Sequence, residues 1–257
     1  MVTIIGIPFD GKSSYLPGAA LAPERIREEF RSPAYNVFSE SLINVQQGIE
    51  DHGDIRAETY DELHQQIHRL DLGRQPYLFL GGDHSITYVL IKKLCALYGR
   101  TFHILQFDAH GDLYDEFEGD RFSHACSFAR IMEEGLALSL TQVGIRALTP
   151  HQREQAERFG VTVFHMDDVE RFNPSLLRGP LYISLDMDAF DPAFAPGVSH
   201  HEAGGLNSRQ VIQWLHQIRT PVIGADLVEF NPSRDNSGIT AALCAKLMKE
   251  FIQLMLQ

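Results

Sequence analysis

Three clusters of histidine and aspartate stand out in the sequence, and each directly follows an apolar run. They are Gly81-Gly82-Asp83-His84-Ser85, Asp108-Ala109-His110-Gly111-Asp112 and Asp186-Met187-Asp188-Ala189-Phe190-Asp191-Pro192. Side chains two residues apart in an extended chain point the same way. Asp108, His110 and Asp112 are therefore predicted to converge, and so are Asp186 and Asp188.

The number of carboxylates gives these clusters a chemical meaning. A single histidine after a strand is usually structural, and a single aspartate there usually caps a helix. Several carboxylates in one pocket are costly unless cations hold them together. Two divalent ions would balance four aspartates, and two imidazoles would complete a set that suits manganese, although imidazole also accepts zinc, iron or nickel. The predicted metal ligands are His84, Asp108, His110, Asp112, Asp186 and Asp188.

Two neighbouring ions of this kind can lower the pKa of a shared water and provide hydroxide at neutral pH. The sequence therefore predicts a two-metal hydrolase.

The elements that must position these side chains are short strands. Apolar runs rich in β-branched residues recur along the chain, and most do not alternate with polar residues, as expected for strands buried on both faces of a parallel sheet. They are Val2–Ile7, Tyr77–Leu80, Phe102–Phe107, Leu140–Val143, Val161–Phe164, Leu181–Leu185 and Val222–Leu227. In such sheets ligands gather at the carboxyl ends of the strands, which is where the clusters lie.

Segments with helical periodicity separate the runs and complete an α/β pattern. Apolar faces are formed by Tyr60, Leu63, Ile67 and Leu70, and by Leu243, Leu247, Phe251 and Leu254. Asn207 or Ser208 could cap a helix through Ile218, and Pro23 suits the first turn of a helix through Phe30. With no linker or repeat visible, residues 1–257 are predicted to form one domain with a mostly parallel central sheet.

The net charge, the cysteines and the lack of long apolar runs exclude several classes of function. The formal net charge of −12 over 257 residues argues against nucleic-acid binding, which requires a basic face. The three cysteines are widely spaced and suggest neither a disulfide framework nor a zinc ribbon. No secretory signal or membrane-length apolar run is visible, so no membrane partner and a cytoplasmic location are expected.

One motif suggests nucleotide binding instead. Gly6–Ser13 matches the phosphate-binding pattern G-x-x-x-x-G-K-S. That motif needs a helix that begins at its Lys-Ser, and Ser14-Tyr15-Leu16-Pro17-Gly18 would break such a helix at once. A loop beside the active site is the favoured interpretation.

The chain resembles the ureohydrolase superfamily of arginases, agmatinases and formimidoylglutamases. The resemblance covers nearly the whole chain, from Gly6–Asp10 and Pro17–Pro23 through the three clusters to Val228-Glu229-Phe230-Asn231-Pro232. The runs Asp112–Gly119, Ser123–Ile131 and Ala195–His200 look most like plant-type arginases and their bacterial relatives.

The resemblance implies a three-layer α/β/α arginase-like fold with two Mn²⁺ ions per subunit. Asp108 and Asp186 would bridge the ions. His84 and Asp112 would complete the shell of one ion, and His110 and Asp188 that of the other. It further implies that Asp83 and Asp191 orient the ligands, and that the protein is a homo-oligomer, a trimer or a hexamer.

The implied reaction is hydrolysis of a guanidinium carbon to urea and an amine. Glu229 matches the position that pairs with the guanidinium, a task suited to a carboxylate facing a planar donor fork. His124 matches the proposed proton shuttle to the leaving amine. His200 and His201 stand where many relatives have Thr-Gly-Thr-Pro, and His200 is a candidate substrate contact.

The substrate is expected to be a small cationic guanidino compound. The loop Leu113–Ser123 carries Asp115, Glu116, Glu118 and Asp120 against Arg121, which favours agmatine, whose far end is a free amine. L-Arginine is a close second, because the motifs look plant-type. Formimidoylglutamate, other guanidino compounds and a metal-binding scaffold without turnover are the remaining alternatives.

Overall fold

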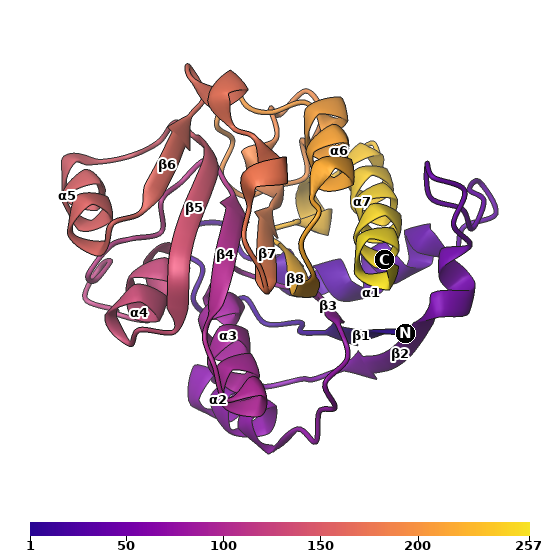
Figure 1. Ribbon diagram of the computed structural model, residues 1–257, viewed down its shortest axis with the longest axis horizontal. Helices are drawn as coiled ribbons and strands as arrows, with labels where there is room; N and C mark the ends of the chain where they lie inside the picture. Colours follow the sequence, from indigo (N-terminus) through magenta and orange to yellow (C-terminus); the bar gives the residue numbers. More distant parts are fainter.

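A computed structural model describes all 257 residues of the protein. Eight parallel strands form one sheet through the middle of the molecule (Figure 1). The strands lie in the order β2-β1-β3-β8-β7-β4-β5-β6. They are β1 Val2–Gly6, β2 Ile49–Asp54, β3 Tyr77–Leu80, β4 Phe102–Phe107, β5 Ala137–Ile145, β6 Thr162–His165, β7 Leu181–Asp186 and β8 Val222–Val228.

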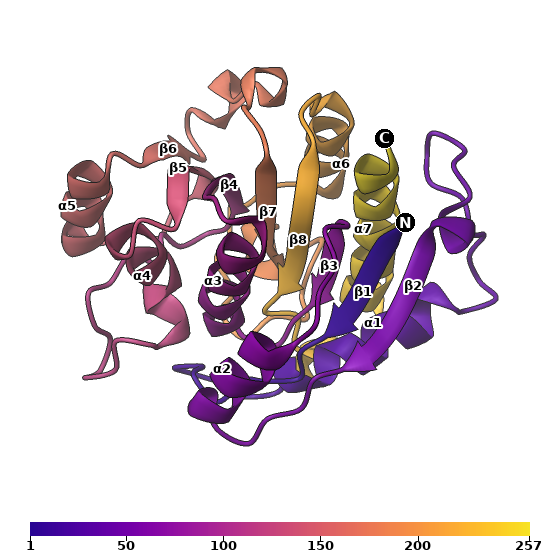
Figure 2. The ribbon, with the colours of Figure 1, turned by 60° about the horizontal axis from the view of Figure 1, so that its bottom comes forward.

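Helices cover both faces of this sheet. They are α1 Ala22–Phe30, α2 Tyr60–Arg69, α3 Ser85–Tyr98, α4 Ser127–Glu133, α5 Pro150–Phe159, α6 Ser208–Gln217 and α7 Ile239–Leu256. Figures 1 and 2 show α1, α6 and α7 on one face and α2, α3 and α4 on the other. The predicted three-layer α/β/α fold is therefore confirmed. None of the helices is long and apolar enough to cross a bilayer.

The core lies in two layers, one on each side of the sheet. Along β1, Val2 and Ile4 join the apolar cluster beneath α1, α6 and α7, whereas Ile5 joins the cluster beneath α2 and α3. Leu78 and Phe79 of β3 divide in the same way. Because successive side chains point to opposite faces, a strand buried on both faces must be apolar throughout, as the runs predicted.

All seven predicted strands are present, but the sequence did not reveal β2. This strand reads Ile-Glu-Asp-His-Gly-Asp, pairs only with β1 at the edge of the sheet and has four exposed residues. The predicted helices are also confirmed. Pro23 lies in the first turn of α1, and Asn207 caps α6 in a reciprocal capping box with Gln210.

The strands that lead into the candidate site are neighbours at the centre of the sheet. Their order is β3-β8-β7-β4, although they are far apart in sequence. Because all of them are parallel, the residues that follow them meet at one edge of the sheet. The Gly6–Ser13 segment continues into irregular backbone at this edge, and the next helical turn begins only at Ala19.

Candidate metal centre and active site

Like Asp108, His84 is a predicted ligand that is completely buried. It follows β3, caps α3, and has no solvent-exposed surface. Its Nδ1 lies 3.2 Å from Asp108 Oδ2, 3.0 Å from Asp112 Oδ2 and 3.1 Å from Asp186 Oδ2. Despite these distances Nδ1 has no hydrogen-bond partner of acceptable geometry. A ring nitrogen surrounded by three carboxylates in this way is arranged to share a cation with them.

A second group of ligands surrounds His110. Its Nδ1 lies 3.1 Å from Asp188 Oδ2 and 3.5 Å from Asp108 Oδ1. The ligand atoms of His84, Asp108 and Asp112 form one possible metal group, and those of Asp108, His110 and Asp188 form another. Asp108 belongs to both, with one oxygen turned toward each histidine. Five of the six predicted ligands thus form two groups that share a carboxylate, and the sixth, Asp186, lies beside His84.

The convergence has a different cause from the one predicted. The residues after β4 and β7 are not extended. Instead Asp108 Oδ1 accepts the N–H of His110 at 2.6 Å, and Asp186 Oδ1 accepts the N–H of Asp188 at 2.7 Å. In these turns the aspartate side chain accepts a hydrogen bond from the backbone N–H of the second residue after it. In each turn the other aspartate oxygen faces His84 Nδ1.

A chain of hydrogen bonds fixes the tautomer of the His84 ring. The Asp226 carboxylate can only accept, so the one Ser184 hydroxyl proton is donated to Asp226 Oδ1, at 2.6 Å. Ser184 Oγ must then accept from His84 Nε2, 2.8 Å away. The proton of the neutral ring is thereby on Nε2, and the Nδ1 lone pair faces the carboxylates.

The charges at the site also fit bound cations. Burial, reinforced by neighbouring Asp188 and Asp108, raises the pKa of Asp186 well above its ordinary value. Burial also opposes ionisation of Asp108, but the neighbouring His110 and His84 imidazoles lower its pKa. Carboxylates packed this closely repel one another unless positive charge lies between them. The donor set of carboxylate oxygens and imidazole nitrogens therefore fits two divalent ions.

Glu229 and His124 form a pair at the rim of the metal groups. Glu229 follows β8, and its Oε1 accepts the His84 N–H and contacts His124 Nδ1, both at 2.8 Å. Burial opposes protonation of His124, but the charge of Glu229 raises its pKa to about 9. Glu229 (φ 62°) and Asp112 (φ 48°) both have left-handed backbone, a strained conformation that is often found at functional sites.

The loop after β1 contributes a third residue, Ser14, which contacts His124. Ser14 donates its N–H to His124 Nε2 at 3.1 Å, and its hydroxyl lies 2.8 Å from the same nitrogen. In the neutral ring the proton is therefore on Nδ1, facing Glu229. The loop predicted to lie beside the active site does so, and it supplies a residue that the sequence did not single out.

His200 lines the same pocket, but His201 does not. The His200 ring centre lies 5.9 Å from that of His110, 5.6 Å from that of His124 and 5.5 Å from that of Tyr15. Burial and the charge of His124 lower its pKa. His201 instead contacts the backbone oxygen of Pro196 at 2.7 Å. His200 is thus placed to contact a ligand as a neutral ring.

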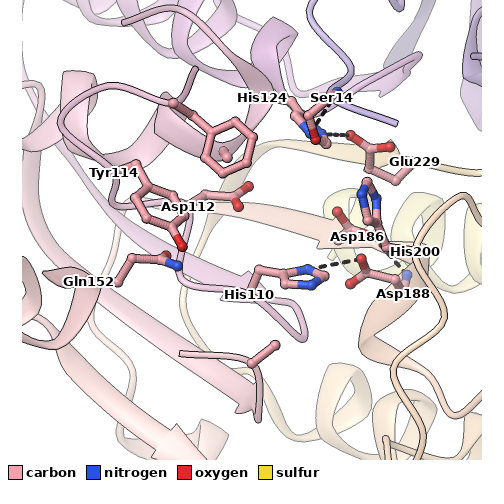
Figure 3. Close-up of a pocket in the computed structure, with 13 residues that line it drawn as sticks. Ser14, His110, Asp112, Tyr114, His124, Gln152, Asp186, Asp188, His200 and Glu229 are labelled. Carbon is pink, nitrogen blue, oxygen red and sulfur yellow. Dashed lines mark hydrogen bonds and ion pairs between the residues drawn. The ribbon is translucent and has the colours of Figure 1, made fainter. Parts of the chain in front are cut away.

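The pocket over these groups has a volume of about 160 Å³ and is lined by thirteen residues (Figure 3). Figure 3 shows Glu229 and His124 on one side and Tyr114 and Gln152 on the other. Phe117 and Ala147 also line it. This wall was not predicted from the sequence, because aromatic, aliphatic and amide residues carry no distinctive motif.

The acidic residues of the loop after Asp112 do not face the pocket. Asp120 pairs with Lys12 at 2.6 Å, and Asp115 pairs with Arg121 at 3.2 Å. Glu116 and Glu118 are exposed, and none of the four acidic residues lines the cavity. The charge argument for agmatine is therefore wrong, since it rested on these side chains.

Asp83 and Asp191 also have roles that differ from the prediction. Asp83 accepts the N–H groups of Lys12 and Ser85, which anchors the β1 loop to the start of α3. Asp191 accepts the N–H groups of Gly204 and Gly205. Neither carboxylate hydrogen-bonds a predicted ligand. Both instead hold the loops that surround the site.

Comparisons with known proteins agree with this geometry. The sequence model of the arginase family matches residues 1–253. Arginase 1, mitochondrial, of Arabidopsis thaliana is 42% identical over 96% of this chain and 79% of its own length. The agmatinase of Bacillus anthracis is 31% identical over 98% of this chain and 90% of its own length. The solved structure of the arginase from Medicago truncatula superimposes with a TM-score of 0.94 at 38% identity, covering 99% of this chain and 87% of that one.

Proposed function

The chain belongs to the arginase family of metal-dependent hydrolases that act on guanidino C–N bonds, and we propose that within this family it is an arginase, converting L-arginine and water to L-ornithine and urea. This reverses the order predicted from the sequence, in which agmatine stood first. The higher identity to a plant arginase, 42% against 31% for an agmatinase, supports the change.

The observation that carries the proposal is the uncharged wall opposite Glu229. Tyr114 and Gln152 present a phenol and an amide there, and the only carboxylates that line the pocket are Glu229 and three of the predicted metal ligands. Agmatine would place an isolated ammonium group against this wall. Arginine would place a zwitterionic end there, whose carboxylate can accept hydrogen bonds from neutral donors. Neutral hydrogen-bonding groups therefore suit arginine better.

The proposed metal ligands are the six residues His84, Asp108, His110, Asp112, Asp186 and Asp188, with two Mn²⁺ ions as the native metals. When bound, such ions supply Lewis acidity and lower the pKa of water at the site. The carboxylates and imidazoles hold that positive charge at the floor of the pocket.

Glu229 would orient the substrate. Its Oε1 is occupied by the His84 N–H and the His124 ring, which leaves Oε2 for a guanidinium N–H. A charged hydrogen bond of this kind fixes the plane of the guanidinium group over the ligand cluster. His200 would pack beside the substrate as a neutral ring.

His124 would donate the proton that the leaving amine requires. Hydrolysis forms a C–O bond and breaks a C–N bond, and the amine nitrogen must gain a proton as it leaves. The Glu229 charge favours the protonated His124 ring. The Ser14 hydroxyl beside Nε2 offers a route by which the ring can be reprotonated.

The test is urea release by the Mn²⁺-reconstituted protein from L-arginine and agmatine in separate assays. We expect kcat/KM for L-arginine to be at least about tenfold higher, a difference of ~1.4 kcal/mol in transition-state binding. An Asp108→Ala, His110→Ala double variant controls for contaminating activity. A preference for agmatine would overturn the arginase assignment, and no urea from either substrate would redirect the search to other guanidino compounds.

A further inference from the structure

Two buried glutamines lie behind the ligand cluster and have no role in the reaction proposed above. Gln106 on β4 and Gln142 on β5 are partners in the register of the two strands, and both are completely buried. Gln142 Nε2 donates to Gln106 Oε1 at 2.7 Å. Gln106 Nε2 in turn donates to Asp108 Oδ2 at 2.7 Å.

The orientation of both amides is determined by their neighbours. The Asp108 carboxylate only accepts, so Gln106 must turn its NH₂ group toward it and its oxygen toward Gln142. At the other end Gln142 Nε2 also donates to the backbone oxygen of Gly111 at 2.6 Å, and a carbonyl likewise only accepts. Gln142 therefore donates to both Gly111 and Gln106, and Gln106 donates to Asp108.

This arrangement is costly for the fold. Gln142 Oε1 is buried and has no hydrogen-bond partner. An unsatisfied acceptor in the interior is destabilising, and apolar side chains at both positions would avoid it. The pair is therefore poorly explained as packing between two strands.

The consequence of the amide chain is seen at Asp108. Oδ1 accepts the His110 N–H, and Oδ2 accepts from Gln106. Each oxygen thus has one fixed donor from the protein. The same two oxygens face His110 Nδ1 and His84 Nδ1, at 3.5 Å and 3.2 Å. Both hydrogen bonds together fix the carboxylate between the two ligand groups.

We propose that Gln106 and Gln142 are positioning residues that hold Asp108 as the ligand shared by both metal ions. The inference rests on the proposed ligation by Asp108. Gln106 acts directly on the carboxylate, and Gln142 acts through Gln106 by fixing its amide. Loss of either donor frees the carboxylate to rotate away from the shared position, which weakens binding of the ion pair.

The experiment measures Mn²⁺ binding to Gln106→Met and Gln142→Met without substrate. Methionine keeps the length and volume of glutamine but cannot donate. Calorimetric titration gives stoichiometry and affinity, and electron paramagnetic resonance distinguishes two coupled Mn²⁺ ions from isolated ones. The matched control is Gln253→Met, a buried glutamine on α7 outside the pocket.

We expect Gln106→Met to bind Mn²⁺ about 10- to 100-fold more weakly, the usual cost of losing a group that orients a ligand, and to lose the coupled signal. Gln142→Met should show a smaller loss. The double variant should match Gln106→Met alone, because Gln142 acts through Gln106. The control should bind like the wild type.

Wild-type affinity and an intact coupled signal in folded Gln106→Met would overturn the proposal. So would additive losses in the double variant, which would make the two residues independent. If Gln106→Met does not fold, Gln142→Met decides, and wild-type Mn²⁺ affinity in that variant would overturn the proposal. Failure of the wild type itself to bind two ions would instead refute the proposed ligand set.

Discussion

Tyr114 lies in the pocket wall opposite Glu229, on the same side as Gln152 (Figure 3). Its ring stacks on His151, with ring centres 5.9 Å apart and an interplanar angle of 16°. The aromatic ring is thus held in place by packing, and the hydroxyl is available to a substrate carboxylate. Tyr114→Phe should therefore raise KM for L-arginine about 5- to 10-fold, which corresponds to one lost hydrogen bond of ~1 kcal/mol.

Steady-state kinetics with both substrates would check this effect. Because agmatine has no carboxylate, its KM should stay unchanged in Tyr114→Phe, and kcat for arginine should change little. Equal effects on the two substrates would mean that the hydroxyl contributes to the shape of the pocket and not to recognition of the far end.

Some residues of the site could be identified from the sequence, and others could not. His84 and the aspartate clusters were identifiable because several carboxylates and imidazoles in one place have few chemical uses. The acidic residues Asp115 and Asp120 misled the substrate prediction, since net charge along a loop does not reveal which side chains face the cavity. In the structure both are paired with basic residues away from it.

At the scale of elements, a network of ion pairs fastens the loop after α1 to α6 and α7. Glu40 receives two hydrogen bonds from Arg209, at 2.6 Å and 3.0 Å, and its Oε1 lies 3.1 Å from Lys246 Nζ. The hydrogen bonds from Arg209, opposed by burial and aided by Lys246, lower the pKa of Glu40 from 4.5 to about 2. The ionised form is therefore favoured in the folded state.

This shift makes a contribution to stability that depends on pH. A lowered pKa stabilises the fold above the unfolded value of 4.5, and the benefit disappears as pH falls toward about 2. Glu40→Gln should lower the free energy of unfolding by roughly 1 kcal/mol near neutral pH, since the pair is partly exposed to solvent. Urea unfolding at several pH values should show the gap closing below about pH 4.5. A gap that is constant with pH would exclude the ion pair as its cause.

Some strands and helices could be predicted from the sequence more readily than others. The apolar runs revealed seven strands, because burial on both faces leaves no room for polar residues. The edge strand β2 was missed, since it is polar and largely exposed. Helix α3 follows His84 directly and has eight buried residues, so it lacks the polar face by which a surface helix is recognised.

At the scale of the whole molecule, the fold brings four buried aspartates together, and bound cations would relieve their mutual repulsion. Mn²⁺ should therefore stabilise the protein strongly. Free Mn²⁺ at about a thousand times its Kd would contribute ~4 kcal/mol per site. For a chain of this size that corresponds to a rise in Tm of roughly 8–16 °C. Thermal unfolding with and without the metal would measure it.

The Asp108→Ala, His110→Ala double variant provides the comparison, because it removes the shared carboxylate and one imidazole. Its Tm should respond little to Mn²⁺. A rise in Tm as large as that of the wild type would place the stabilising ions elsewhere on the acidic surface.

The central claim is that the molecule is an arginase, and a competition assay tests it most directly. Equal concentrations of L-arginine and agmatine are incubated with the Mn²⁺-loaded protein, and the ornithine and putrescine that form are quantified in the same sample. Their initial ratio equals the ratio of the two kcat/KM values. We predict ornithine in at least about tenfold excess, since the neutral wall of Tyr114 and Gln152 suits a zwitterionic end. Putrescine in excess would contradict the assignment.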